Sequence, residues 1–157
     1  MASSSARDFD EMMAALGLLT SRFNWLETEF KLALIKLLNC SNQEAAYAVI
    51  EERRGFENLL ALVDRLFRIY NSDTESRAQL SKIIKDAKHL CGERNKYVHS
   101  IWYQPLDPQK SVARMKGRYG EELSPAAIIK IAEKMADCLT ALKNLMMKSL
   151  PIDRREQ

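Results

Sequence analysis

Residues 8–38, DFDEMMAALGLLTSRFNWLETEFKLALIKLL, decide the fold of this chain. Their apolar residues recur at alternating steps of three and four, which is the spacing of one continuous stripe on a helix face. The pattern predicts one long helix over residues 8–38, with Asp8 as its N-cap. Such a stripe suits either the core of a helical bundle or an interface with a second copy of the chain. It consists of Phe9, Met12, Leu16, Leu19, Phe23, Leu26, Phe30, Ala33 and Leu37.

Length and composition are those of an ordinary globular domain. The chain has 157 residues, of which 46% are apolar and 29% charged, so it can bury a core of its own. We expect a single domain over residues 1–157, with flexible tails at residues 1–7 and 151–157. The net charge of +3 permits an anionic partner without requiring one. No signal sequence and no apolar run of about 20 residues is present, so we expect a cytoplasmic protein with no membrane segment.

Two more long helices are predicted downstream of the first. The apolar spacing gives a second helix over residues 42–70, and Gly55 interrupts it, so that it is either kinked or divided in two. A third helix is predicted over residues 74–102, with Asp73 or Thr74 as its N-cap.

The sequence then changes character before a last helix. Residues 103–120 contain two prolines and short alternating runs, which indicate a short β-hairpin or an irregular insertion. Ser124 and Pro125 are typical of the N-cap and first position of a helix, and Pro151 ends that helix. The fold class predicted from these segments is all-α, a bundle of four to five helices.

The cysteines do not form a recognisable set. Cys40, Cys91 and Cys138 are odd in number and far apart, which fits neither a disulfide framework nor a zinc site. Free cysteine is usually a small buried apolar residue, so we assign these three to packing in a reducing compartment. No metal ion and no cofactor is predicted.

One short stretch, ERNKYVHSIW over residues 93–102, combines guanidinium, amide and imidazole groups. On an ideal helix Arg94 falls inside the apolar arc, Asn95 and His99 lie at its edge, and Lys96 faces solvent. A buried guanidinium needs a partner, so Arg94 forms either an internal ion pair with Glu27 or Glu29 or a contact with an anion in a cleft. An imidazole near neutral pH, an amide and a permanent cation are the groups that hold a phosphate and move a proton.

At Arg94-Asn95-Lys96-Tyr97-Val98-His99 the sequence resembles the HEPN superfamily (higher eukaryotes and prokaryotes nucleotide-binding). That family's signature is an arginine, often followed by a polar residue, then a histidine separated from the arginine by four to six residues, near the end of a late helix in a small all-α domain. The resemblance implies a metal-independent endoribonuclease that acts as a homodimer, with both motif helices lining a shared cleft. It also implies a toxin or antiphage component, with an antitoxin protein as a further partner.

The resemblance assigns roles to the motif residues. His99 is expected to act as general acid or base, Arg94 to bind the scissile phosphate, and Asn95 to orient His99 or the phosphate. The four cations Lys110, Arg114, Lys116 and Arg118, with no acid between them, are expected to follow an RNA backbone, and Tyr103 or Tyr119 to stack on a base. The expected RNA-binding residues are Lys96, Tyr103, Lys110, Arg114, Lys116 and Arg118.

Two other interpretations stay open at this point. The chain is either a non-catalytic HEPN-like module that binds RNA, a nucleotide or a protein, or a dimeric helical scaffold in which Arg94 and His99 are structural. The cations of residues 110–118 equally fit an ordinary basic loop. Cleavage of RNA without a divalent metal separates the first interpretation from the other two.

Overall fold

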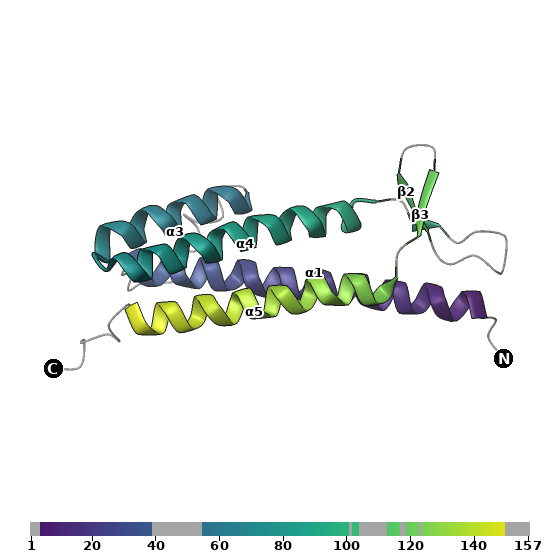
Figure 1. Ribbon diagram of the computed structural model, residues 1–157, viewed down its shortest axis with the longest axis horizontal. Coiled ribbons are helices and arrows are strands. Elements are labelled where there is room, and N and C mark those ends of the chain that lie inside the picture. The colour runs from purple at the N-terminus through teal and green to yellow at the C-terminus, as the bar shows by residue number, and fades with distance from the viewer. Residues whose placement is uncertain are drawn as a thin grey trace. The chain divides into compact units, whose positions relative to one another are not determined.

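The computed structural model describes residues 4–38, 55–100, 102–103, 113–116, 119–122 and 124–149 (Figure 1). Within them the helices are α1 (Ser4–Leu38), α3 (Phe56–Tyr70), α4 (Thr74–Val98) and α5 (Pro125–Ser149). This is the all-α helical bundle that the periodicity predicts. None of the described helices combines the length and the apolarity that crossing a bilayer requires.

Two predicted helix ends are wrong. Helix α1 begins at Ser4 and not at Asp8, so residues 4–7 belong to the helix and not to a flexible tail. Nothing in this segment opposes a helix, since alanine and arginine are good helix formers. Helix α4 ends at Val98 and not at residue 102, because side chains that follow it bond the last carbonyls of the helix.

Gly55 separates α3 from the preceding residues, as the sequence predicts. Its φ is +109°, in a region that favours glycine, and it stands directly before the first residue of α3. A side chain at this position would strain the backbone, so the glycine fixes where α3 begins. The predicted helical segment over residues 42–54 lies outside the described residues.

The chain divides into two compact units. The first unit consists of residues 1–23 and 89–135, and the second of residues 24–88 and 136–157. Helices α1, α4 and α5 each contribute residues to both units, whereas α3 belongs to the second alone.

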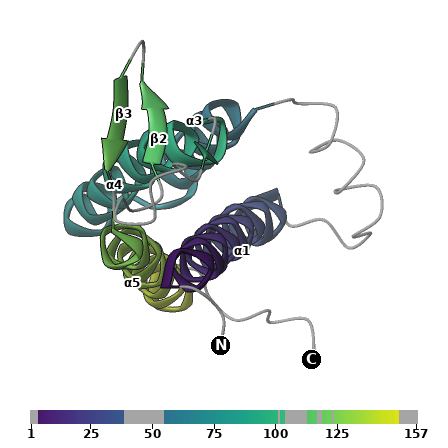
Figure 2. The same ribbon diagram turned by 90° about the vertical axis from the view of Figure 1, so that its right-hand side faces the viewer.

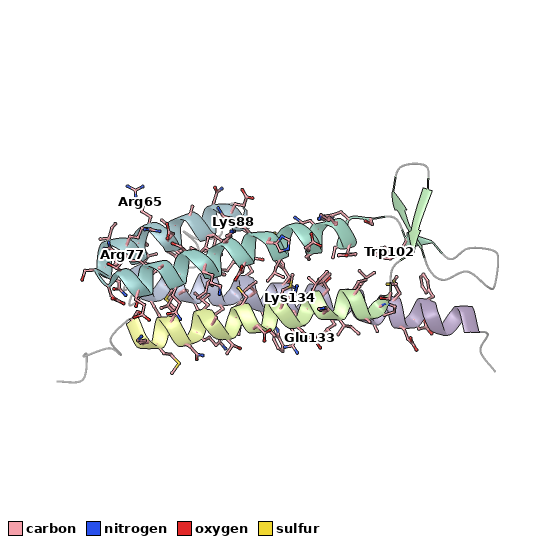
Figure 3. The ribbon with its side chains drawn as sticks, in the orientation of Figure 1. Arg65, Arg77, Lys88, Trp102, Glu133 and Lys134 are labelled. Atoms are coloured by element: carbon pink, nitrogen blue, oxygen red, sulfur yellow. The ribbon has the colours of Figure 1, made fainter. Side chains whose placement is uncertain are left out.

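In the second unit a polar network fixes the turn between α3 and α4, which lie side by side (Figures 1 and 2). Asp73 caps α4 by accepting a hydrogen bond of 2.9 Å from the Ser76 backbone N–H. At the start of α4, Arg77 donates to the carbonyls of Asn71 at 2.6 Å and of Arg68 at 2.8 Å (Figure 3). A guanidinium there satisfies the end of α3, whose carbonyls carry partial negative charge.

Helix α5 joins the second unit through both apolar and polar contacts. The Cys138 thiol donates to the Ile83 carbonyl at 3.6 Å, and Lys143 Nζ lies 3.5 Å from Glu29 Oε2. The buried apolar residues come from all four helices, with Phe30 packed edge-on against Phe56 at 5.7 Å between ring centroids. The buried apolar residues of the second unit include Leu26, Phe30, Leu34 and Leu37 of α1, Leu60, Val63 and Phe67 of α3, Leu80, Ile83 and Ala87 of α4, and Leu142, Leu145 and Met146 of α5.

The first unit is built from the N-terminal part of α1, the C-terminal end of α4, three short strands and the start of α5. Ser124 caps α5 as predicted, accepting from the Ala127 N–H at 3.3 Å, with Pro125 as the first helical residue. The buried apolar residues of this unit are Met12, Ala15, Leu19, Phe23, Leu90, Ile128, Ala132 and Met135.

The strands are β1 (Trp102–Tyr103), β2 (Ala113–Lys116) and β3 (Tyr119–Glu122), in the order β1-β2-β3 with antiparallel pairing. The register places Arg114 opposite Trp102 on one side and opposite Glu121 on the other. Residues 104–112 and 117–118 lie outside the described residues, so the predicted insertion as a whole stays a prediction.

Candidate functional site

The predicted catalytic residues lie at the C-terminal end of α4, in the first unit. Arg94 and Asn95 belong to α4, four and three residues before its end at Val98, whereas His99 is in the turn that follows Val98. The His99 backbone N–H still donates to the Asn95 carbonyl at 3.2 Å, so the chain keeps a helical path up to the histidine. Arg94 is half-buried, and the side chains of Asn95 and His99 are exposed. The helical-wheel prediction for Arg94 is therefore confirmed.

Ser100 and Trp102, which follow the histidine, hydrogen-bond the last carbonyls of α4. The Ser100 hydroxyl donates to the Lys96 carbonyl, and the Ser100 N–H donates to the Tyr97 carbonyl at 3.3 Å. The Trp102 indole N–H donates to the same Tyr97 carbonyl at 2.9 Å (Figure 3 labels Trp102). The turn that carries His99 is therefore fixed by its own backbone bond to Asn95 and by the bonds that Ser100 and Trp102 make to the last carbonyls of α4.

The Arg94 guanidinium has three kinds of surroundings. Its central carbon lies 4.9 Å from the centroid of the Phe23 ring, which comes from α1 and is 6% exposed. One terminal nitrogen, Nη1, donates to the Asn95 side-chain oxygen at 3.0 Å. The Nε atom is buried and has no hydrogen-bond partner among the described residues.

The two carboxylates considered as partners for Arg94 have other partners. Glu27 pairs with Lys31 on the same helix at 3.1 Å, and Glu29 pairs with Lys143 at 3.5 Å. Among the residues that the structure describes, no ion pair includes Arg94. A half-buried cation is thus held by an aromatic face and an amide, with no carboxylate partner among the described residues.

Asn95 is directed at Arg94 and not at His99. Its side-chain oxygen accepts from Arg94, and its Nδ2 lies 3.8 Å from the Cys91 sulfur, one turn earlier. Of the hydrogen bonds made by described residues, none joins the His99 side chain to Asn95 or Arg94. The imidazole therefore stands exposed at the helix end, one turn beyond the amide.

Lys96 is exposed and forms an ion pair with a neighbouring acid. Its Nζ forms an ion pair with Glu93 one turn earlier on α4. A surface pair of this kind contributes little to stability, so it opens readily when a stronger anion approaches.

The other predicted RNA-binding residues are only partly described. Tyr103 lies in β1, and Arg114 and Lys116 lie in β2, two positions apart. The register opposes Arg114 with Glu121, which brings an acidic position beside a cation that has no acid near it in the sequence. Lys110 and Arg118 lie outside the described residues.

Among the described residues, no three His, Cys, Asp or Glu side chains come together as metal ligands. Cys138 is buried, and desolvation, with the negative charge of Asp86 as a lesser cause, raises the pKa of its thiol to about 12. It is a packing residue, as the sequence predicts, while Cys91 is half-buried beside Asn95. Cys40 lies outside the described residues.

The site as a whole can bind an anion and transfer a proton. Arg94 supplies a permanent positive charge, and His99 supplies an exposed imidazole at the same helix end. A permanent cation and an imidazole are the side chains that acid–base chemistry on a phosphate ester uses.

Comparisons with known proteins add one distant relative. No family model matches the chain, and no solved structure matches it. The exocyst complex component SEC8 of Arabidopsis thaliana is 24% identical over 152 residues. This alignment covers 96% of the present chain but 14% of the plant protein, so the chain spans only a small part of that relative's length.

Sequence reasoning missed Phe23 and the roles of Ser100 and Trp102. Phe23 is one of several apolar residues in the α1 stripe, and nothing in the local sequence sets it apart from Phe30. Ser100 and Trp102 lie within residues 93–102, which the sequence singles out. Because the predicted helix extends to residue 102, the sequence does not indicate that these two residues end the helix. Only the fold brings residue 23 to residue 94.

Proposed function

We propose that this chain is a HEPN-like endoribonuclease that cleaves RNA without a metal ion and leaves a 2′,3′-cyclic phosphate. One observation carries the proposal: Arg94 is half-buried, without a carboxylate partner among the described residues, at the helix end that bears the exposed His99. A cation kept uncompensated at this cost is expected where an anionic ligand completes its surroundings.

The proposed mechanism divides the work between the two side chains. The neutral His99 imidazole takes the proton from the ribose 2′-OH, whose oxygen then attacks the adjacent phosphorus. The bond from phosphorus to the 5′-oxygen breaks, and a protonated imidazole returns a proton to that oxygen. Arg94 holds the non-bridging oxygens and stabilises the charge that develops on them. The products are a 2′,3′-cyclic phosphate and a 5′-hydroxyl end.

RNA binding away from the scissile phosphate is assigned to the neighbouring cations and rings. Lys96 is exposed on the last turn of α4, β1 begins four residues after the end of that helix, and β2 is the next described strand. Phosphate contacts made by such side chains give affinity that falls with salt. The proposed set is Lys96, Tyr103, Lys110, Arg114, Lys116 and Arg118.

The partners follow from the same proposal. The active form is a homodimer in which two α4 ends meet, so that two copies of His99 share the acid and base roles. An antitoxin protein that covers this helix end would switch the enzyme off, in a toxin or antiphage setting.

The deciding experiment is RNA cleavage in EDTA by the purified protein. We expect the wild type to produce 2′,3′-cyclic phosphate ends, and His99→Ala and Arg94→Ala to lose about a hundredfold or more in rate. His89→Ala is the matched control, because it removes the other histidine, which is exposed on the same helix. Intact RNA after incubation with wild type, or equal rates for His89→Ala and His99→Ala, would rule out the proposal for the RNAs tested.

A second candidate function is a non-catalytic module that binds a protein. The match to a part of an exocyst complex component, a subunit of a protein assembly by its name, favours it. The exposed His99, which no described side chain orients, is also compatible with a role in binding alone. If this alternative holds, the wild type leaves RNA intact and a protein partner is bound equally well by His99→Ala.

A further inference from the structure

We propose that Phe23 and Asn95 are positioning residues for Arg94, and that together they make the guanidinium meet a phosphate end-on, through Nη1 and Nη2. This inference deepens the proposed function and rests on it for the identity of the ligand as an RNA phosphate. The Phe23–Asn95 pair, which we call the Arg94 clamp, lies entirely within the first unit.

The first step concerns the flat face of the guanidinium. Phe23 is buried on α1, and its ring centroid is 4.9 Å from the central carbon of Arg94. The ring offers its negative π-face to the cation and excludes water from that side. The guanidinium therefore stays charged and half-buried, and no acid among the described residues competes with a ligand for it.

The second step concerns the edges. An arginine can meet a phosphate side-on, through Nε and one terminal nitrogen, or end-on, through both terminal nitrogens. Here Nε is buried, which closes the side-on edge to any ligand. Nη1 gives one N–H to Asn95, and its second N–H and both N–H groups of Nη2 make no described hydrogen bond. We therefore assign a bidentate anion to the end-on edge.

The third step concerns the orientation of the amide. Asn95 Nδ2 lies 3.8 Å from the Cys91 sulfur, which turns Oδ1 toward Arg94 and fixes which atom faces the guanidinium. Phe23 contacts the face of the guanidinium and Asn95 accepts a hydrogen bond from Nη1. These two contacts restrict the rotation of the guanidinium. Prior ordering of this kind lowers the entropy lost when a phosphate binds.

The test compares two equivalent substitutions of buried phenylalanines on the same helix. Phe23→Leu removes the ring under Arg94, and Phe30→Leu removes a ring that packs on Phe56 in the second unit. Both create a similar loss of core volume, so the second variant controls for stability. Asn95→Ala is the third variant, and because Asn95 is exposed we expect it to fold.

The readout is NMR of arginine Nε–H groups, with titration by inorganic phosphate. In the wild type, the Arg94 Nε–H signal is expected to be shifted by the Phe23 ring current, to exchange slowly, and to respond to phosphate. Phe23→Leu should abolish the ring-current shift and weaken phosphate and RNA binding by about threefold to tenfold, whereas Phe30→Leu changes neither. Asn95→Ala should weaken binding while it keeps the ring-current shift.

Failure of this inference and failure of the proposed function give different experimental results. If phosphate perturbs Arg94 through the clamp but no RNA is bound or cut, the clamp stands and the RNA function is lost. If phosphate leaves the Arg94 signal unchanged, or Phe23→Leu binds phosphate as tightly as wild type, the clamp proposal is overturned even when RNA is cleaved.

Discussion

Lysine and arginine carry the same charge, but only arginine has two N–H groups on one edge that reach two oxygens of one phosphate. Arg94→Lys therefore keeps the charge at the end of α4 and removes the end-on fork. Lysine is also a poorer partner for the Phe23 ring. We expect kcat/KM for RNA cleavage to fall by about tenfold or more. The measurement is the cleavage rate over a range of RNA concentrations.

The control for this substitution is Arg65→Lys. Arg65 is exposed on α3 and points away from the helices (Figure 3), so the same chemical change occurs outside the site. Its kcat/KM is expected to match the wild type. A loss of the same size in both variants would mean that arginine content, and not the clamp, governs RNA binding.

Cys138 permits a prediction about reactivity. Burial raises the pKa of its thiol to about 12, so at pH 8 only about one molecule in ten thousand carries the reactive thiolate. We expect iodoacetamide at pH 8 to leave Cys138 unmodified in the native protein and to modify it after unfolding in urea, as read by peptide mass spectrometry. Rapid native alkylation of Cys138 would show that its contact with the Ile83 carbonyl opens frequently.

At the scale of the helix, the end of α4 is held by side chains that follow it. Trp102→Phe keeps an aromatic ring and removes the N–H that donates to the Tyr97 carbonyl, a hydrogen bond worth about 1 kcal/mol. Since the turn with His99 then moves more freely, we expect kcat to fall by about threefold to tenfold while RNA affinity stays unchanged. Faster hydrogen exchange at the amides of residues 99 and 100 would accompany the loss.

Trp25→Phe makes the same chemical change on the exposed side of α1. Its kcat and exchange rates are expected to match the wild type. An equal loss of RNA affinity and kcat in Trp102→Phe would mean that the cap supports the whole site and not the histidine in particular.

The start of α4 gives a prediction about pH. Hydrogen bonds from the Ser76 hydroxyl, and next from its backbone N–H, lower the pKa of Asp73 below its ordinary value. A lowered carboxyl pKa stabilises the fold above the unfolded-state pKa, near 3.9, and that stabilisation is lost as pH falls through the folded-state pKa. Asp73→Asn should therefore have a lower Tm than wild type at pH 7 and a nearly equal Tm at acid pH.

Thermal unfolding followed by circular dichroism between pH 7 and about pH 2 checks this convergence. Asp137→Asn, on the exposed surface of α5, is the control and should show a constant difference from wild type. A difference for Asp73→Asn that stays constant over the same pH range would contradict the assigned cause of the lowered pKa.

For the molecule as a whole, the sequence predicts what depends on local pattern. The α1 stripe, the break at Gly55, the Asp73 cap and the Ser124-Pro125 start of α5 are confirmed, because each needs only neighbours within a few turns. The predicted end of α4 is too late, because the apolar periodicity continues through residues 101 and 102, whereas side-chain hydrogen bonds to carbonyls end the helix.

The candidate site was predictable only in its residue types. Arg94, Asn95 and His99 are adjacent in sequence, so their location at one helix end follows from spacing. The contact of Arg94 with Phe23 joins two distant helices, and the direction of the Asn95 amide depends on Cys91 and Arg94. Neither follows from a pattern, since many apolar residues of α1 are equivalent until the chain folds.

The proposed dimer makes a prediction about how two chains share a site. In the described residues no side-chain bond links Arg94 to His99, and the two residues leave α4 in different directions on a helical path. If each site combines Arg94 of one chain with only the His99 of the other, mixing Arg94→Ala with His99→Ala forms heterodimers with one intact site. After refolding together, random pairing should restore about a quarter of the wild-type rate, because half of the dimers then carry one of two sites. Each variant refolded alone is the control, and sedimentation should give twice the 18.0 kDa of one chain, 36 kDa. Dimers without recovered activity would instead mean that each site needs both copies of His99, or that Arg94 and His99 of each site come from one chain.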